Sequence, residues 1–193
     1  MNRDELTKEE IQNLPTACFS GEIYTIDKED KQFTQAIKYL NKQAVLGFDT
    51  ESRPSFQKGV KNQMALLQLG TKEKVFLFKL RQLGLPHELK AILSSPRIIK
   101  SGVAVRDDIR GLKKIGAFEP LGFVELQSMA KKCNLEYLSL RKLAANQLGL
   151  RVSKSQRLSD WNRDNYTEGQ VNYAATDAWV SLLLFHKLSR FCL

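Results

Sequence analysis

Short apolar segments recur along the chain, and they predict its β-strands. Residues 44–51, AVLGFDTE, form a near-continuous apolar run that ends in acidic residues, as expected of a buried central strand. The apolar segments 64–70 and 74–80 are separated by a short polar stretch, which predicts a β-hairpin. Further strands are predicted at 22–26, on an edge of the sheet, and at 97–105 and 121–127.

Apolar positions spaced three or four residues apart predict the helices. A helix predicted at 28–42 has its apolar residues on one face, and Asp27 or Asp30 can cap its start. The last helix is predicted at 167–189, because Thr167 and Gln170 form a capping box. Other helices are predicted at 86–94, 106–114, 128–133 and 139–148. This order of elements predicts an α/β fold, a mixed sheet with helices on both faces.

The length and composition favour one ordinary globular domain. With 193 residues, 42% of them hydrophobic and 26% charged, the chain is neither disordered nor collagen-like, nor is it a small disulfide scaffold. We expect residues 1–20 to form an N-terminal tail or loose helix and residues 21–193 to form the domain. No apolar run approaches the roughly 20 residues that span a bilayer, so we expect no membrane partner.

The N-terminus and the cysteines predict a cytoplasmic protein. The first residues lack the apolar stretch of a secretory signal. The cysteines, Cys18, Cys133 and Cys192, are far apart and odd in number, and we expect reduced thiols.

The charge balance favours a polyanionic partner. Thirty Lys and Arg against 21 Asp and Glu give a net charge of +9, and nucleic acid is the most common partner of basic proteins. A count of two histidines disfavours a multi-histidine zinc site. The sequence also lacks the C-x-x-C pairs of a zinc ribbon and the glycine-rich loop of a P-loop NTPase.

Asp49 and Glu51 are the first candidates for chemistry. They lie two apart at the end of the first central strand, so both carboxylates point to one face, with Cα atoms ~6.6 Å apart. Carboxylates this close repel unless a proton or cation lies between them, and their hard oxygens suit Mg²⁺ or Mn²⁺. Taken alone, such a pair is more typical of a solvated strand end.

Two further acidic motifs follow along the chain. Asp107 and Asp108 come after the strand ending in GVAV, at the edge where ligands gather in α/β sheets, although either can instead cap the next helix. Tyr173 and Asp177 lie four apart on the last helix and therefore share one face. The same spacing also fits a structural role, with the tyrosine packed into the core and the aspartate at the solvent-exposed edge of the core.

In this order, FDTES (48–52), GVAVRDDIRGL (102–112) and NYAATDAW (172–179) resemble the three motifs of the DEDD exonuclease superfamily, and the tyrosine indicates its DEDDy branch. The hairpin segment and the stretch LSDWNRDNYTEGQ also resemble that family, so the likeness covers about residues 20–190. Ribonuclease D and the exonuclease domain of the Werner syndrome helicase are the members it looks most like. The resemblance implies a ribonuclease H-like fold.

The resemblance to the DEDDy exonucleases also implies a metal-dependent 3′–5′ exonuclease that releases nucleoside 5′-monophosphates with two ions, Mg²⁺ or Mn²⁺. Tyr173 would position the attacking water. Asp108 fits the pattern better than Asp107, because Leu112 follows four residues later. Glu125 stands where relatives often carry aspartate, and we interpret it as structural or as supporting the site. The implied metal ligands are Asp49, Glu51, Asp108 and Asp177.

Basic and aromatic residues flank these motifs and are candidates for nucleic-acid binding. Phosphate contacts from Lys and Arg are independent of sequence and sensitive to salt. Phe56 and Trp161 could stack on a base, but Trp161 could equally pack beneath a helix cap. Met64, Leu66 and Leu67 are expected in the core. The basic candidates are Arg53, Lys58, Lys61, Lys154, Arg157 and Arg163.

Two other functions fit parts of the pattern. One is a catalytically inactive nucleic-acid-binding module of the same fold, although such a module has no physical reason to keep clustered like charges. The other is a phosphohydrolase acting on small nucleotides, which the basic loops disfavour. Ribonuclease D-like and Werner-like relatives point to RNA and DNA respectively. The long loop after Glu51, which is similar to that of the Werner domain, slightly favours DNA.

Overall fold

A computed structural model describes residues 5–54 and 63–192. Its centre is a six-stranded sheet in the order β1-β4-β3-β2-β5-β6. β1 pairs with β4, β2 with β5, and β5 with β6 in parallel, whereas β2–β3 and β3–β4 are antiparallel. The predicted mixed sheet, its edge strand and its hairpin are confirmed. The strands are β1 Glu22–Ile26, β2 Val45–Ser52, β3 Met64–Gly70, β4 Lys74–Lys79, β5 Ile99–Gly102 and β6 Phe123–Glu125.

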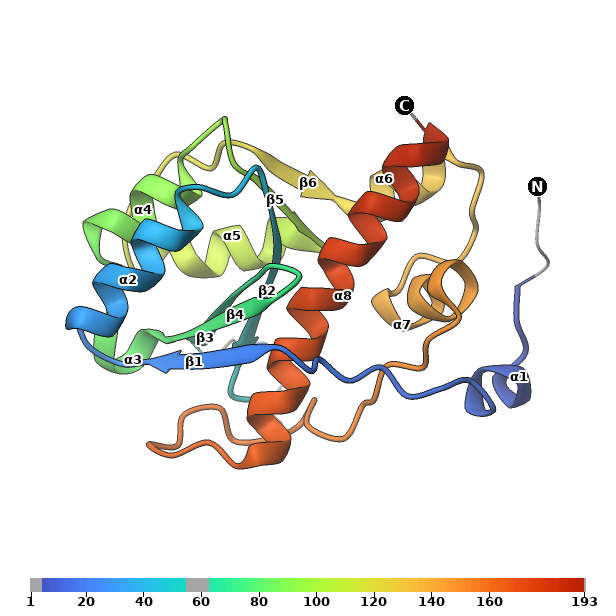
Figure 1. The fold of residues 1–193 in the computed structure, drawn as a ribbon, viewed down its shortest axis with the longest axis horizontal. Coiled ribbons are helices and arrows are strands. Elements are labelled where there is room, and N and C mark those ends of the chain that lie inside the picture. Colours follow the sequence, from blue (N-terminus) through green and yellow to red (C-terminus); the bar gives the residue numbers. More distant parts are fainter. Residues whose placement is uncertain (1–4, 55–62, 193) are drawn as a thin grey trace.

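Helices cover both faces of this sheet, as predicted (Figure 1). On one face, α2, α4 and α5 bury apolar residues such as Phe33, Leu89 and Leu112 against the strands. On the other, α8 packs across β2, β3, β4 and β5. The helices are α1 Lys8–Gln12, α2 Lys31–Leu40, α3 Leu80–Leu83, α4 His87–Leu93, α5 Val105–Lys113, α6 Leu126–Lys132, α7 Leu140–Leu143, the π-helix η1 Ala144–Leu148, and α8 Glu168–Cys192.

Side-chain caps set the start of several helices. The Asp30 carboxylate accepts hydrogen bonds from the backbone of Gln32 and Phe33, so Asp30 and not Asp27 caps α2. Thr167 and Gln170 form the predicted capping box before α8. Each cap satisfies backbone N–H groups that have no partner within the helix.

The structure corrects two predicted boundaries. The strand predicted at 97–105 ends at Gly102, because Ala104 adopts the left-handed conformation, with φ 60°, and α5 begins at Val105. The helix predicted at 139–148 changes from α7 into η1, where buried Asn146 donates to the Lys142 carbonyl and accepts from the Leu6 N–H. A π-helical turn widens the helix, and here it accompanies a contact with the N-terminal segment.

α8 lies against β2 with no room between them at Gly47. A Cβ built at Gly47 would come within 1.8 Å of the Ala178 carbonyl oxygen. Only glycine permits this approach of helix backbone to strand backbone. Because Asp49 follows Gly47 by two residues and Asp177 precedes Ala178, this contact brings the first and third motifs together.

The structure also tests the expectations about core residues, cysteines and membrane spans. Leu66 and Leu67 are fully buried and Met64 packs against the core, as predicted. Cys18 is free and exposed, but Cys133 is disulfide-bonded. The prediction of reduced thiols is therefore wrong for Cys133, and the cysteines give no support to a reducing compartment. None of the helices described is long and apolar enough to span a bilayer.

Candidate active site

Four carboxylates from three elements meet beside the centre of the sheet. Asp49 and Glu51 project from β2, Asp177 from α8 and Asp108 from the first turn of α5. Asp49 interacts electrostatically with each of the other three. The strand alternation of Asp49 and Glu51, together with the close contact of α8 at Gly47, accounts for the convergence of Asp49, Glu51 and Asp177. Asp108 approaches from α5 through its hydrogen bond with Thr50.

Burial raises the pKa values of all four groups, and repulsion from the other carboxylates of the cluster raises those of Asp49 and Glu51 further. Loss of solvent is the largest cause in each case. It raises the pKa of Asp108 to about 6, of Asp177 to about 7 and of Glu51 to about 9. Asp177 and Asp108 raise the Glu51 pKa further, whereas Arg157 lowers it. The pKa of Asp49 lies well above its ordinary value, through burial and then the charges of its neighbours.

Tyr173 stands one helical turn before Asp177, and the interaction of its hydroxyl with that carboxylate lowers the pKa of Asp177. Burial and the adjacent carboxylates raise the pKa of the Tyr173 hydroxyl above its ordinary value. The hydroxyl therefore stays protonated near neutral pH, so it can orient a neighbour by hydrogen bonding but cannot act as a free base.

The structure separates the two adjacent aspartates. The Asp108 carboxylate accepts a hydrogen bond of 2.6 Å from the Thr50 hydroxyl, next to Asp49. Asp107 is exposed and forms an ion pair with Arg110 on the same helix. One residue of shift turns a helical side chain by about 100°, which explains why only Asp108 faces the cluster.

Glu125 has a structural role, in agreement with its interpretation from the sequence. Its carboxylate accepts hydrogen bonds of 3.0 Å from the backbone N–H groups of Ala104 and Val105, and one of 3.1 Å from that of Gln127. It therefore holds the starts of both α5 and α6. Its charge also raises the pKa of Asp108.

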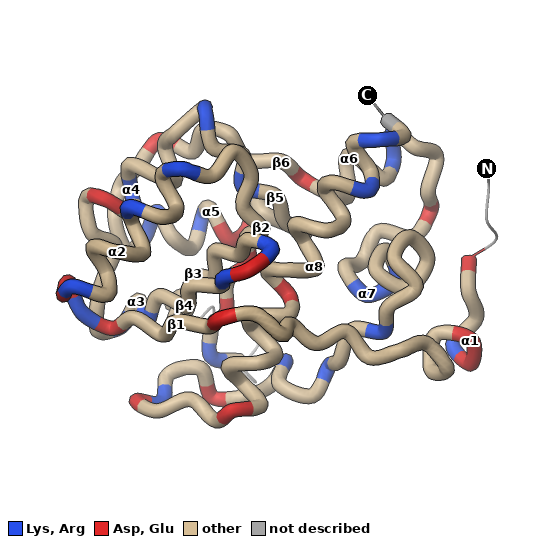
Figure 2. The backbone as a smooth tube through the Cα atoms, viewed as in Figure 1, with Lys and Arg blue, Asp and Glu red and all other residues tan. Residues whose placement is uncertain are grey.

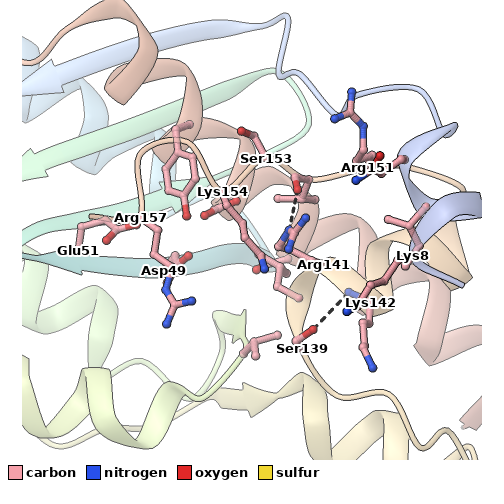
Figure 3. A pocket seen from close by; sticks show the side chains of 18 residues that line it. Lys8, Asp49, Glu51, Ser139, Arg141, Lys142, Arg151, Ser153, Lys154 and Arg157 are labelled. Atoms are coloured by element: carbon pink, nitrogen blue, oxygen red, sulfur yellow. Dashed lines mark hydrogen bonds between the residues drawn. The ribbon is translucent and has the colours of Figure 1, made fainter. Parts of the chain in front are cut away.

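A cavity of about 670 Å³ opens beside the carboxylates, within the size range of ~300–1,000 Å³ for ligand sites. Asp49, Glu51, Tyr173 and Asp177 line it, and Asp108 lies outside the lining. Two predicted basic residues, Lys154 and Arg157, line it as well. Figure 3 shows Arg157 beside Asp49 and Glu51 at one end of the cavity.

The other predicted binding residues lie elsewhere. Arg53 forms an ion pair of 3.8 Å with Asp160, and Arg163 is exposed outside the cavity. Trp161 is 1% exposed and packs against Tyr166 and Tyr173, which excludes base stacking and confirms the packing alternative. Phe56, Lys58 and Lys61 lie outside the described residues.

Four cations that sequence reasoning did not identify complete the lining. Lys8 comes from α1, Arg141 and Lys142 from α7, and Arg151 from the segment after η1. Figure 2 shows basic positions on α7 and on the connection before α8, on the side of the molecule where α1 lies. The net charge of +9 is a global signal, and it does not show which cations converge.

The carboxylates have the chemistry of a divalent-metal site. Their oxygens are hard ligands, and the Asp177 Oδ1 is buried with no hydrogen-bond partner among the described residues. A cation would satisfy that oxygen and relieve the repulsion. In the described ranges, no three or more His, Cys, Asp or Glu side chains stand as a ready ligand set.

Comparison with known proteins agrees with this geometry. A family model described as 3′–5′ exonuclease matches residues 24–191. The mouse bifunctional 3′–5′ exonuclease/ATP-dependent helicase WRN is 35% identical over 186 residues, covering 91% of this chain and 13% of that relative. This chain therefore corresponds to a small part of the relative's length.

Solved structures share the fold. Escherichia coli RNase D, described as an exoribonuclease involved in structured RNA processing, superposes with a TM-score of 0.78 at 24% identity, covering 88% of this chain and 44% of that one. Trypanosoma brucei RNase D in complex with RNA U12 has a TM-score of 0.74 at 18% identity, covering 96% and 64%. With the family model spanning nearly all of the domain, the chain belongs to the DEDDy branch of the 3′–5′ exonuclease family.

Proposed function

We propose that this chain is an active, divalent-metal-dependent exonuclease that removes nucleoside 5′-monophosphates from the 3′ end of a nucleic acid. The observation that carries the proposal is a cluster of four carboxylates, three of which line a cavity walled by basic residues. Asp49, Glu51, Asp108 and Asp177 would hold two ions, Mg²⁺ or Mn²⁺. Such ions supply Lewis-acid stabilisation of the attacking and leaving oxygens and lower the pKa of bound water.

The chain's own residues hold and orient the reactants. The Tyr173 hydroxyl, kept protonated and fixed beside Asp177, would hydrogen-bond the attacking water and fix its line of approach to the phosphorus. Arg157 stands next to Glu51 and, with Lys154, would contact oxygens of the phosphate chain.

DNA is the polymer we favour over RNA. The support for this preference is the sequence resemblance to the exonuclease domain of the Werner syndrome helicase, which extends to 35% identity with WRN. Both polymers present the same phosphodiester to the carboxylates.

A degradation ladder tests the proposal. Single-stranded DNA, duplex DNA with a recessed 3′ end and RNA, each labelled at the 5′ end, are incubated with the protein in Mg²⁺, Mn²⁺ or EDTA. We expect products that shorten from the 3′ end, no reaction in EDTA, and faster cleavage of DNA than of RNA.

Adjacent aspartates provide a matched pair of variants. Asp108→Asn should reduce the rate at least about 100-fold, the scale expected when an electrostatic contact of the transition state is lost. Asp107→Asn changes an exposed side chain of the same helix turn and should leave the rate within about twofold. Intact substrate with both metals, despite salt-sensitive binding, would instead identify an inactive nucleic-acid-binding module.

A further inference from the structure

The cavity has a second basic wall, opposite the carboxylates, whose cations come from segments far apart in the chain. We define this far wall as Lys8, Arg141, Lys142 and Arg151. In Figure 3, Asp49 and Glu51 lie at one end of the cavity, Lys8 and Lys142 at the other, and Arg141 between them. The cavity is therefore longer than the carboxylate site.

Specific contacts hold the far wall together. The Arg141 Nε donates a hydrogen bond of 2.8 Å to the Val152 carbonyl, which directs its guanidinium into the cavity. Arg151 donates to the Thr16 hydroxyl. Four cations converge here. Among the described residues, Lys142 forms an ion pair with Glu5, and the charge of Arg141 lowers the pKa of Asp177. Four cations against these two carboxylates leave a positive surplus, which is the electrostatic signature of a polyanion site.

The N-terminal segment builds part of this wall. The Leu6 N–H donates to Asn146 on η1, at 2.9 Å. Farther along, the Arg151 N–H donates to the Pro15 carbonyl at 2.9 Å, and the Ala17 N–H donates to the Arg151 carbonyl at 2.8 Å. A capping box between Thr7 and Glu10 orders α1 between these anchors. Lys8 is therefore presented to the cavity by a docked segment.

We propose that the far wall binds the backbone phosphates of the nucleic-acid strand upstream of the bond that is cleaved, with Lys8 of the N-terminal segment as one of its contacts. This inference rests on the proposed exonuclease function and assigns a strand-binding role to a segment that the sequence placed in a tail. The wall selects a polymer over a mononucleotide, because a mononucleotide reaches the carboxylates without reaching Lys8 and Lys142 at the other end of the cavity.

Two substrates separate the far wall from the reacting centre. One is a short single-stranded DNA. The other is the p-nitrophenyl ester of thymidine 5′-monophosphate, whose hydrolysis breaks the same kind of phosphodiester and releases p-nitrophenol, but which has no upstream strand. Lys8→Ala and Lys142→Ala should each raise KM for the oligonucleotide about threefold to fivefold, the effect of one exposed charge contact. The KM and kcat for the ester should stay unchanged.

Salt dependence gives an independent readout. Each lysine removed should reduce the slope of log KM against log salt concentration by about 0.7 for a single strand. Lys38→Ala, an exposed lysine of α2 on the opposite side of the sheet, is the matched control and should change neither KM nor slope.

Glu5→Gln gives a change of opposite sign. It removes the charge that compensates Lys142, so it should lower KM for the oligonucleotide about twofold to threefold. If the ion pair has a purely structural role, Glu5→Gln should raise KM for the oligonucleotide or leave it unchanged. Either result would overturn the proposal. Equal effects of Lys8→Ala on both substrates, or no effect on either, would also overturn it. A wild-type protein inactive on both substrates would refute the exonuclease function itself, which is a distinguishable outcome.

Discussion

The contact of Gly47 with α8 offers a sharp test of how the fold assembles the site. In Gly47→Ala, the new Cβ would stand 1.8 Å from the Ala178 carbonyl oxygen and 3.0 Å from the Leu182 nitrogen. Ordinary contact begins at 3.4 Å, so α8 must withdraw from β2 by about 1.6 Å at this point. Both neighbours are backbone atoms, which a side-chain rotation cannot move aside.

The withdrawal has a structural and a catalytic consequence. Overpacking of this kind costs ~1–3 kcal/mol of stability, which corresponds to a fall in Tm of about 2–12 °C for a chain of this size. Asp177 and Tyr173 belong to α8 and lie beside this contact, so a displacement of α8 moves them relative to Asp49. A misplacement of ~1 Å can cost about 100-fold in rate, and we expect kcat to fall by at least that factor.

Thermal unfolding and single-turnover cleavage of the oligonucleotide measure the two effects. Gly116→Ala is the control, because a Cβ at Gly116 meets its nearest neighbour at an ordinary 3.4 Å. It should leave both Tm and rate close to wild type. A folded Gly47→Ala protein with kcat within threefold of wild type would refute the claim that this contact sets the distance between the motifs.

Three further predictions concern charge and packing. Folding raises the pKa values of the clustered carboxylates, so the folded state without metal binds more protons than the unfolded state between about pH 4 and 9. Its free energy of unfolding should therefore fall as pH rises through that window. Thermal melts in EDTA should show this decrease, Asp177→Asn should make it smaller, and Mn²⁺ should stabilise the protein most at the alkaline end. Glu125→Ala leaves three backbone N–H groups without their acceptor and should cost ~1–3 kcal/mol, read as a Tm lower by about 2–12 °C; an unchanged Tm would contradict its capping role. Trp161→Ala should destabilise the protein by ~3–5 kcal/mol in denaturant titration, whereas Trp161→Leu, which keeps an apolar side chain but removes the aromatic ring, should retain oligonucleotide affinity, which a base-stacking role would not permit.

Much of the reacting centre was predictable because its residues are related by local periodicity. Asp49 and Glu51 share a face because strand side chains alternate, and Tyr173 and Asp177 share one because residues four apart adjoin on a helix. The hairpin, the edge strand and the last helix follow from similarly short-range patterns of apolar residues and caps. Each of these relations depends on neighbours in sequence, so the sequence alone determines it.

Tertiary structure decided whatever depends on contacts between distant segments. Asp108 faces the cluster and Asp107 does not, because the packing of α5 sets the helix's rotation. Trp161 is buried because α8 and its preceding connection close over it. Lys8 and Arg141 line one cavity because hydrogen bonds dock the N-terminal segment against η1 and Arg151. No periodicity relates such positions along the chain; only the packing of the whole fold brings their charges together.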